Sequence, residues 1–125
     1  MHFALVCLGG AVGTGARYLL GGLAIRWLGA DFPHGTLLVN LIGSLLIGLV
    51  QELGAALAIP EGVRVVVAVG VLGGFTTYSA FAYESLRLAG EGAWGAAVLY
   101  VGLTTMLCLG ACLLGIAAGR LAAGG

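Results

Sequence analysis

The side chain of Asn40 stands within a long apolar run and is a strong candidate for binding chemistry. Thr36 and Ser44 lie four residues before and after it, so the three polar groups would share one face of a helix. An amide NH₂ group is a neutral donor, which suits it to an anion. A hydrogen bond to a neighbouring helix would satisfy the same amide, and the sequence leaves both interpretations open.

A second candidate is the run of hydroxyl side chains from Thr76 to Ser79, which follows the glycine pair Gly73 and Gly74. No single helical face can hide four consecutive polar side chains, and paired glycines lower helix stability. We therefore expect a helix that is broken here. Its freed carbonyls can coordinate a cation, and the following half-helix points its amide donors inward. An intact helix that packs through its glycines is the alternative.

Arg17 is the third candidate, because it lies midway along an apolar run. A buried arginine in such a run costs several kcal/mol unless it reaches the interface, pairs or faces water. It would either help an anion approach or stabilise the fold through hydrogen bonds to nearby carbonyls.

A weakly polar stripe near the C-terminus repeats every four residues, at Tyr100, Thr104, Cys108 and Cys112. The stripe would line a narrow path, or it would pack in a core with the threonine bonded to its own helix. We interpret the cysteines, Cys7 included, as small apolar side chains, because their spacing fits neither a zinc site nor a disulfide framework.

The composition identifies the solvent that surrounds these groups. Of the 125 residues, 61% are hydrophobic and 8% are charged, whereas a soluble domain has about a quarter charged residues. The net charge of zero excludes a basic surface for nucleic acid. No nucleophile is spaced with a base or a metal set, so we expect no enzyme. The first twenty residues lack a basic leading segment, so we expect no cleaved signal.

Hydropathy and length predict an all-α integral membrane protein. About 20 helical residues span a bilayer, and four runs are long enough: 3–28, 35–57, 63–86 and 93–118. Short connectors separate the runs, so we expect one four-helix transmembrane domain over residues 1–125.

The arginines predict an unusual topology. With four spans both termini lie on one side, together with Arg64 and Arg120, while Arg26 and Arg87 lie on the other. Two arginines on each side give no positive-inside preference. The chain can therefore insert in both orientations and pair with itself as an antiparallel homodimer; the alternative is that another feature of the chain resolves the weak bias.

Three sequence runs resemble a known family. They are the glycine-rich run 9–18 ending in Arg17 and Tyr18, the run 35–44 around Asn40, and the run 73–81 from Gly73 to Phe81. In combination they resemble the fluoride channels of the Fluc (CrcB) family. The resemblance implies passive, fluoride-selective export from the cytoplasm across the cell (inner) membrane, which reduces fluoride toxicity. It also implies an antiparallel dual-topology dimer with two pathways and one buried sodium ion, the partner being an identical copy or a paralogue.

The resemblance further implies roles for individual residues. The fluoride pathway would comprise Asn40, Thr77, Tyr78, Ser79, Phe81, Tyr100 and Thr104. The sodium ion would be held at the dimer axis by backbone carbonyls of Gly73 and Thr76 from both copies. Position 78 departs from the family, which usually has phenylalanine there. Fluoride is small and strongly hydrated, so neutral amides, hydroxyls and aromatic ring edges must replace its water.

Two other functions fit a short four-helix membrane protein. A small multidrug transporter would want a carboxylate within a span, whereas the acids here lie near span ends or in connectors. A non-transporting membrane assembly subunit would explain the glycines, but it would leave Asn40 and the hydroxyl run without a purpose.

Overall fold

The computed structural model describes residues 1–124, and in this range every regular element is a helix. The elements are α1 (His2–Leu28), α2 (His34–Ala56), α3 (Glu61–Val65), the π-helix η1 (Val66–Leu72), α4 (Gly73–Phe75), α5 (Tyr78–Gly90) and α6 (Trp94–Ala122). By length and composition four segments can cross a membrane: α1, α2, α6 and the combined segment Glu61–Gly90. The prediction of an all-α protein with four membrane-spanning helices is confirmed.

The ends of the helices differ slightly from the expected spans. The third segment begins at Glu61, directly after Pro60, and continues to Gly90 rather than residue 86. The fourth ends at Ala122 rather than residue 118. Both extensions carry an arginine, Arg87 and Arg120. A long arginine side chain reaches toward water from inside a helix, so a charge does not require the helix to end.

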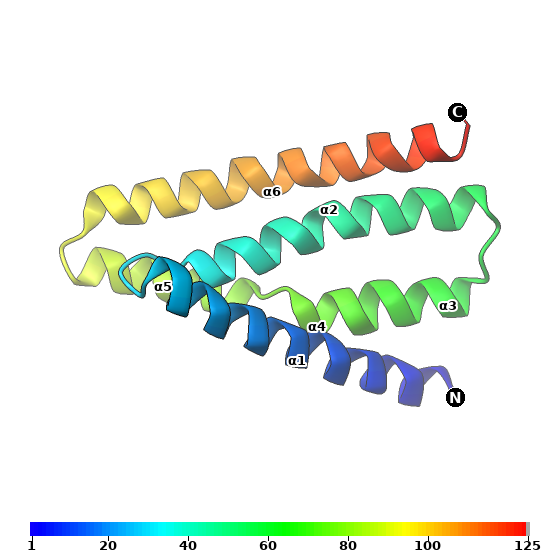
Figure 1. Cartoon of the computed structure of the whole chain (residues 1–125), viewed down its shortest axis with the longest axis horizontal. Coiled ribbons are helices and arrows are strands. Elements are labelled where there is room, and N and C mark those ends of the chain that lie inside the picture. The colour runs from blue at the N-terminus through cyan, green and yellow to red at the C-terminus, as the bar shows by residue number, and fades with distance from the viewer. Residues whose placement is uncertain (125) are drawn as a thin grey trace.

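The helices form two layers (Figure 1). Helices α2 and α6 lie side by side over most of their length, and α1 crosses the rod made by α3, η1 and α4. Both chain termini and the connector between α2 and α3 lie at one end of the molecule, as an even number of spans requires. Arg64 and Arg120 are therefore at the terminal end, and Arg26 and Arg87 are at the other.

Glycines set the spacing between α2 and α6. A Cβ atom on Gly48 would lie 2.9 Å from the backbone nitrogen of Ile116, and one on Gly115 would overlap the carbonyl oxygen of Leu45. Real Cβ atoms essentially never approach backbone so closely. Small residues thus bring the two backbones into close contact. In a membrane the hydrophobic effect does not drive helices together, so close packing of this kind supplies the stabilising energy.

Helix α1 contacts the third segment in the same way. A Cβ atom on Gly13 would lie 2.9 Å from the backbone nitrogen of Phe75, and one on Gly74 would lie 2.6 Å from the carbonyl oxygen of Gly10. The widened π-helical turn lies just before this contact, and the N–H of Gly73 bonds there to the carbonyl of Ala68, five residues back. Gly9 and Gly13 of the first run are therefore packing residues, whereas Gly15 is not.

Gly13→Ala is expected to destabilise the protein by about 1 to 3 kcal/mol, because the new methyl group would overlap the backbone around Val71 and Phe75. Gly15→Ala on the same helix is the matched control, since nothing lies within 4 Å of its Cβ position. Thermal unfolding in detergent measures both variants. Equal midpoints for the two would contradict this packing.

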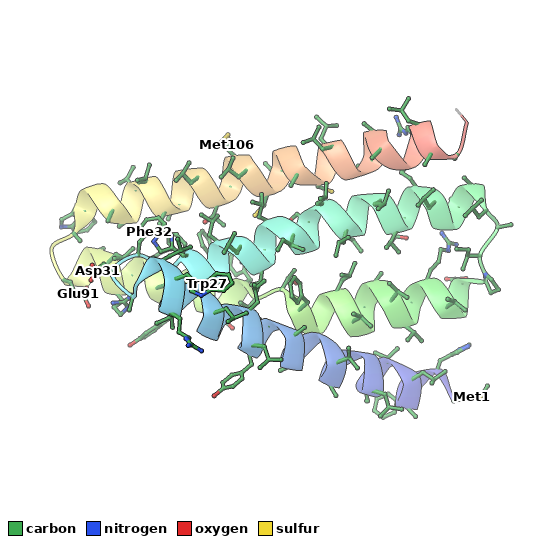
Figure 2. The ribbon with its side chains drawn as sticks, in the orientation of Figure 1. Met1, Trp27, Asp31, Phe32, Glu91 and Met106 are labelled. Carbon is green, nitrogen blue, oxygen red and sulfur yellow. The ribbon has the colours of Figure 1, made fainter. Side chains whose placement is uncertain are left out.

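The single chain has a small interior and a large apolar surface. Tyr100, Val39 and Leu88 are among the few side chains that are almost completely buried, whereas leucines and aromatic rings along α1 and α6 are exposed. Figure 2 shows Met106 projecting outward from α6, and Asp31 and Glu91 at the end opposite the termini. Lipid is the natural neighbour for these outward apolar groups.

Candidate functional site

The third membrane segment changes conformation at Thr76 and Thr77. Thr76 has φ −89° and ψ 163°, and Thr77 has φ −152° and ψ 118°, so both residues are extended. Helical geometry resumes at Tyr78, where the hydroxyl oxygen of Thr77 accepts a hydrogen bond from the N–H of Ala80 at 3.2 Å. Thr77 is thus the N-cap of α5. Figure 1 shows the trace between α4 and α5 as a thin connection facing α2.

Asn40 of α2 binds both backbone polar groups of one extended residue, Thr77. Its amide nitrogen donates to the carbonyl of Thr77 at 3.0 Å, and its amide oxygen accepts from the N–H of Thr77 at 2.8 Å. An unpaired backbone group in lipid costs several kcal/mol, so these two hydrogen bonds stabilise the extended backbone at Thr77. The contact corresponds to the helix-to-helix alternative for Asn40. Because an amide NH₂ has two N–H groups, one of them remains for another acceptor.

Arg17 of α1 approaches the same region from the other side. Its Nε donates to the carbonyl of Gly74 at 3.1 Å. In an unbroken helix that carbonyl would accept from the N–H of Tyr78, four residues on. The arginine therefore replaces a backbone donor that the extended residues remove, and this contact corresponds to the stabilising alternative for Arg17.

Other backbone groups around the extended pair stay free. Among residues 1–124, the hydrogen bonds leave the carbonyls of Gly73 and Thr76 without a donor and the N–H groups of Tyr78 and Ser79 without an acceptor. Gly73 is also exposed on the surface of the single chain. The interruption thus presents both oxygen ligands and amide donors.

A cavity of about 470 Å³ lies beside the interruption, between α2, the third segment and α6. Seven of the predicted site residues line it, namely Asn40, Gly73, Thr76, Thr77, Tyr78, Phe81 and Thr104. Ser44 and Cys108 contribute further polar groups, and every residue that lines the cavity is uncharged. The cavity is therefore a neutral site that offers amide and hydroxyl groups next to aromatic rings.

The hydroxyl of Thr104 is unsatisfied in this cavity. Thr104 is 7% exposed, and its Oγ1 has no hydrogen-bond partner among the residues that the structure describes. Buried hydroxyls normally find a partner, so one without a protein partner at a cavity wall marks a place for a ligand or water.

Two residues of the predicted fluoride pathway lie outside the cavity. The hydroxyl of Ser79 lies 3.4 Å from that of Thr77 on the exposed start of α5. Tyr100 is completely buried, and its hydroxyl donates to Glu84 Oε1 at 3.0 Å. Its ring packs against Phe81, with the ring centres 5.3 Å apart. Tyr100 therefore supports the cavity wall through Phe81.

A larger cavity of about 1,000 Å³ opens between α1, α2 and α5. Its polar lining includes Arg17, Arg26, Arg87, His34 and Glu84. Thr77 lines both this cavity and the smaller one. The larger cavity thus has more arginines than carboxylates in its lining, although Arg87 also pairs with Glu91, and it shares Thr77 with the neutral cavity.

One residue of the site was not singled out from the sequence, and a second was named there with two interpretations left open. Glu84 is a carboxylate inside the third segment that binds the buried Tyr100, whereas sequence reasoning placed all the acids near span ends or in connectors. Cys108 lines the neutral cavity; from the sequence its thiol was interpreted as a small apolar group, but the residue was also placed on a stripe that would line a narrow path. The four-residue stripe from Tyr100 to Cys112 was the only available signal for Cys108.

These features define a multi-pass membrane protein with a neutral polar site beside the extended residues Thr76 and Thr77. The chain belongs to the family described as CrcB-like protein, Camphor Resistance (CrcB), whose model matches residues 4–116. The family suggested by the three sequence runs is thereby confirmed.

Curated relatives cover most of the chain. A protein of Anaeromyxobacter dehalogenans is 52% identical over 108 residues, or 86% of each chain. One of Magnetococcus marinus is 46% identical over 122 residues, which is 97% of this chain and 99% of the relative. One of Agrobacterium fabrum is 42% identical over 121 residues, which is 96% of this chain and 97% of the relative. All three are named fluoride-specific ion channel FluC. Relatives named as ion channels support the prediction that the chain is not an enzyme.

Proposed function

We propose that this protein is a fluoride-selective channel that lets fluoride leave the cytoplasm passively. Its curated relatives are named fluoride-specific ion channels. The single structural observation that carries the proposal is the neutral cavity beside the extended residues. A pore must replace the water around a small anion without holding the anion too tightly, and neutral donors in series meet that need.

The pathway runs along the polar groups of the neutral cavity. The free N–H of Asn40, the hydroxyls of Thr77 and Thr104, and the free amides at the start of α5 donate to the ion. Ser79 extends this polar track at the exposed start of α5, and Tyr100 holds Phe81 in place. The rings of Tyr78 and Phe81 have centres 5.6 Å apart and meet edge to face at 65°, so that a ring edge, which is positive, is available to an anion.

Arg17 has a second role in this proposal. It lines the larger cavity together with Arg26 and Arg87, and the concentrated positive charge raises the local concentration of anions. The anion then moves to the neutral cavity near Thr77, which lines both. The charged arginines of the larger cavity thus attract the anion, and the neutral donors of the smaller cavity let it leave again.

The working unit is an antiparallel dimer in the inner membrane, formed with an identical copy or a paralogue. Two arginines at each end leave the orientation of a single chain undetermined. Tyr78 is 80% exposed in the single chain, and a second copy over this face would cover it. Such a dimer places two interrupted helices at one axis.

A sodium ion fits the oxygen groups at that axis. The free carbonyls of Gly73 and Thr76 are hard, neutral ligands, and two copies would supply four of them. Unwound backbone carbonyls are the ligands that membrane proteins use for sodium. A bound sodium would tie the two copies together and offset the partial negative charge of the carbonyls.

Purified protein in liposomes loaded with fluoride tests the proposed function. A fluoride-selective electrode is expected to record rapid efflux without a proton gradient, and a chloride-selective electrode is expected to record none. Efflux of a cationic drug driven by a proton gradient would instead indicate a small multidrug transporter. Well-folded protein that passes neither would indicate a non-transporting assembly subunit. Either result overturns the proposal.

A further inference from the structure

One of the three cysteines faces the neutral cavity. Cys108 of α6 is half-buried and lines the space, one helical turn after Thr104. Cys112 is one turn further along α6 and does not line the cavity, and Cys7 is exposed on α1. All three are free thiols. Cys7 and Cys112 therefore serve as internal comparisons for Cys108, which is the one of the three that lines the cavity.

Thr104 indicates that the surroundings of Cys108 are not tightly packed apolar core. It is more than nine-tenths buried, and its hydroxyl has no partner within the described part of the chain, although it stands at the same cavity wall. The cavity of about 470 Å³ has room for on the order of ten water molecules at about 30 Å³ each. A small polar solute can therefore occupy the space beside the thiol.

The other groups in the cavity have different chemistry from Cys108. Amide, hydroxyl and carbonyl oxygens are hard ligands, and the cavity lining contains no methionine, histidine or carboxylate. Soft metal cations prefer thiolate sulfur over such oxygens. Cys108 is therefore the one strong ligand for a soft cation among the residues that line this cavity.

We propose that Cys108 makes the cavity a binding site for thiophilic soft-metal cations, and that occupancy of the site closes the cavity to anions. For methylmercury chloride the sulfur–mercury bond forms and the mercury–chlorine bond breaks. Chloride leaves and the thiol proton passes to water, so no electrons are transferred. The closure part rests on the proposed function, and the binding part does not.

Labelling tests the binding part directly. The full chain is treated in liposomes with methylmercury chloride, and the added mass is located by peptide mass spectrometry. The double variant Cys7→Ser/Cys112→Ser is expected to take up one mercury at Cys108, and Cys108→Ser to take up none at position 108. A thiol at position 108 that reacts only after denaturation would overturn the site.

Flux measurements test the closure part. Each variant is compared with its own untreated fluoride efflux, because Cys108 lines the cavity and its replacement can itself change the rate. The reagent is expected to slow efflux about tenfold or more in the parent and in the double variant, and less than about twofold in Cys108→Ser. Equal inhibition of Cys108→Ser, or full efflux from labelled parent, would overturn closure. If untreated protein passes no fluoride, the proposed function fails, while labelling still decides the site.

Discussion

Replacing Asn40 by alanine is expected to lower fluoride efflux about a hundredfold. The change removes both hydrogen bonds to Thr77, and each backbone group left unpaired costs about 1 to 3 kcal/mol, which corresponds to roughly fivefold to more than a hundredfold. It also removes the N–H group that we assign to the ion. Initial efflux from liposomes at matched protein density measures the effect.

Two further variants separate the roles of Asn40. Asn40→Asp keeps an oxygen for the N–H of Thr77 but loses the amide donors and adds a negative charge, so efflux should also fall while the folded protein survives. Ser44→Ala, one turn along the same helix and at the same cavity, is the matched control and should lose far less. Normal efflux from Asn40→Ala would show that this amide contributes neither to the backbone conformation nor to the pathway.

The second large effect is expected at the aromatic pair. Phe81→Ile should lower efflux strongly, because it removes a ring that contacts both Tyr78 and Tyr100 and with it the positive ring edge. Tyr78→Phe should conduct about as well as the parent if the ring edge is what fluoride uses. Among the described residues the hydroxyl of Tyr78 makes no hydrogen bond within the chain, so its removal breaks no internal contact.

Tyr83→Ile is the matched control for the aromatic pair, since Tyr83 is an exposed ring on the same helix and lines neither cavity. The measurement is again initial efflux at matched protein density. A collapse in Tyr78→Phe together with nearly normal efflux in Phe81→Ile would reverse the assignment and make the hydroxyl the ligand.

The membrane spans could be predicted because hydropathy and length depend only on local sequence. The face of each span that turns inward could not be predicted. Helices α1 and α6 are apolar on all sides, so periodicity does not select a buried face. For this reason the stripe that carries Cys108 left cavity lining and core packing both open, and the thiol lines the neutral cavity. The partner of Asn40 is 37 residues away, and a single sequence gives no signal for such a contact.

The neighbourhood of the hydroxyl run shows the same limit. The run predicted unusual backbone near Thr76 and Thr77, because consecutive polar side chains conflict with a helix in lipid. Nothing in Val66–Leu72 predicted a π-helical turn. Its register depends on how η1 packs against α1, and packing of this kind is set by the folded neighbours rather than by local composition. The bond from Tyr100 to Glu84 was missed for a similar reason.

The contacts that Arg17 and Asn40 make with the third segment bear on how the chain enters the bilayer. Both residues precede Gly74 and Thr77, their partners, in the sequence, so the ribosome synthesises them first. Extended backbone is the most costly part of this protein to transfer into lipid. The first two helices can already be in the membrane when that segment emerges, and they carry the donors and the acceptor it needs. The order of synthesis thus matches the order in which the hydrogen-bonding groups are required.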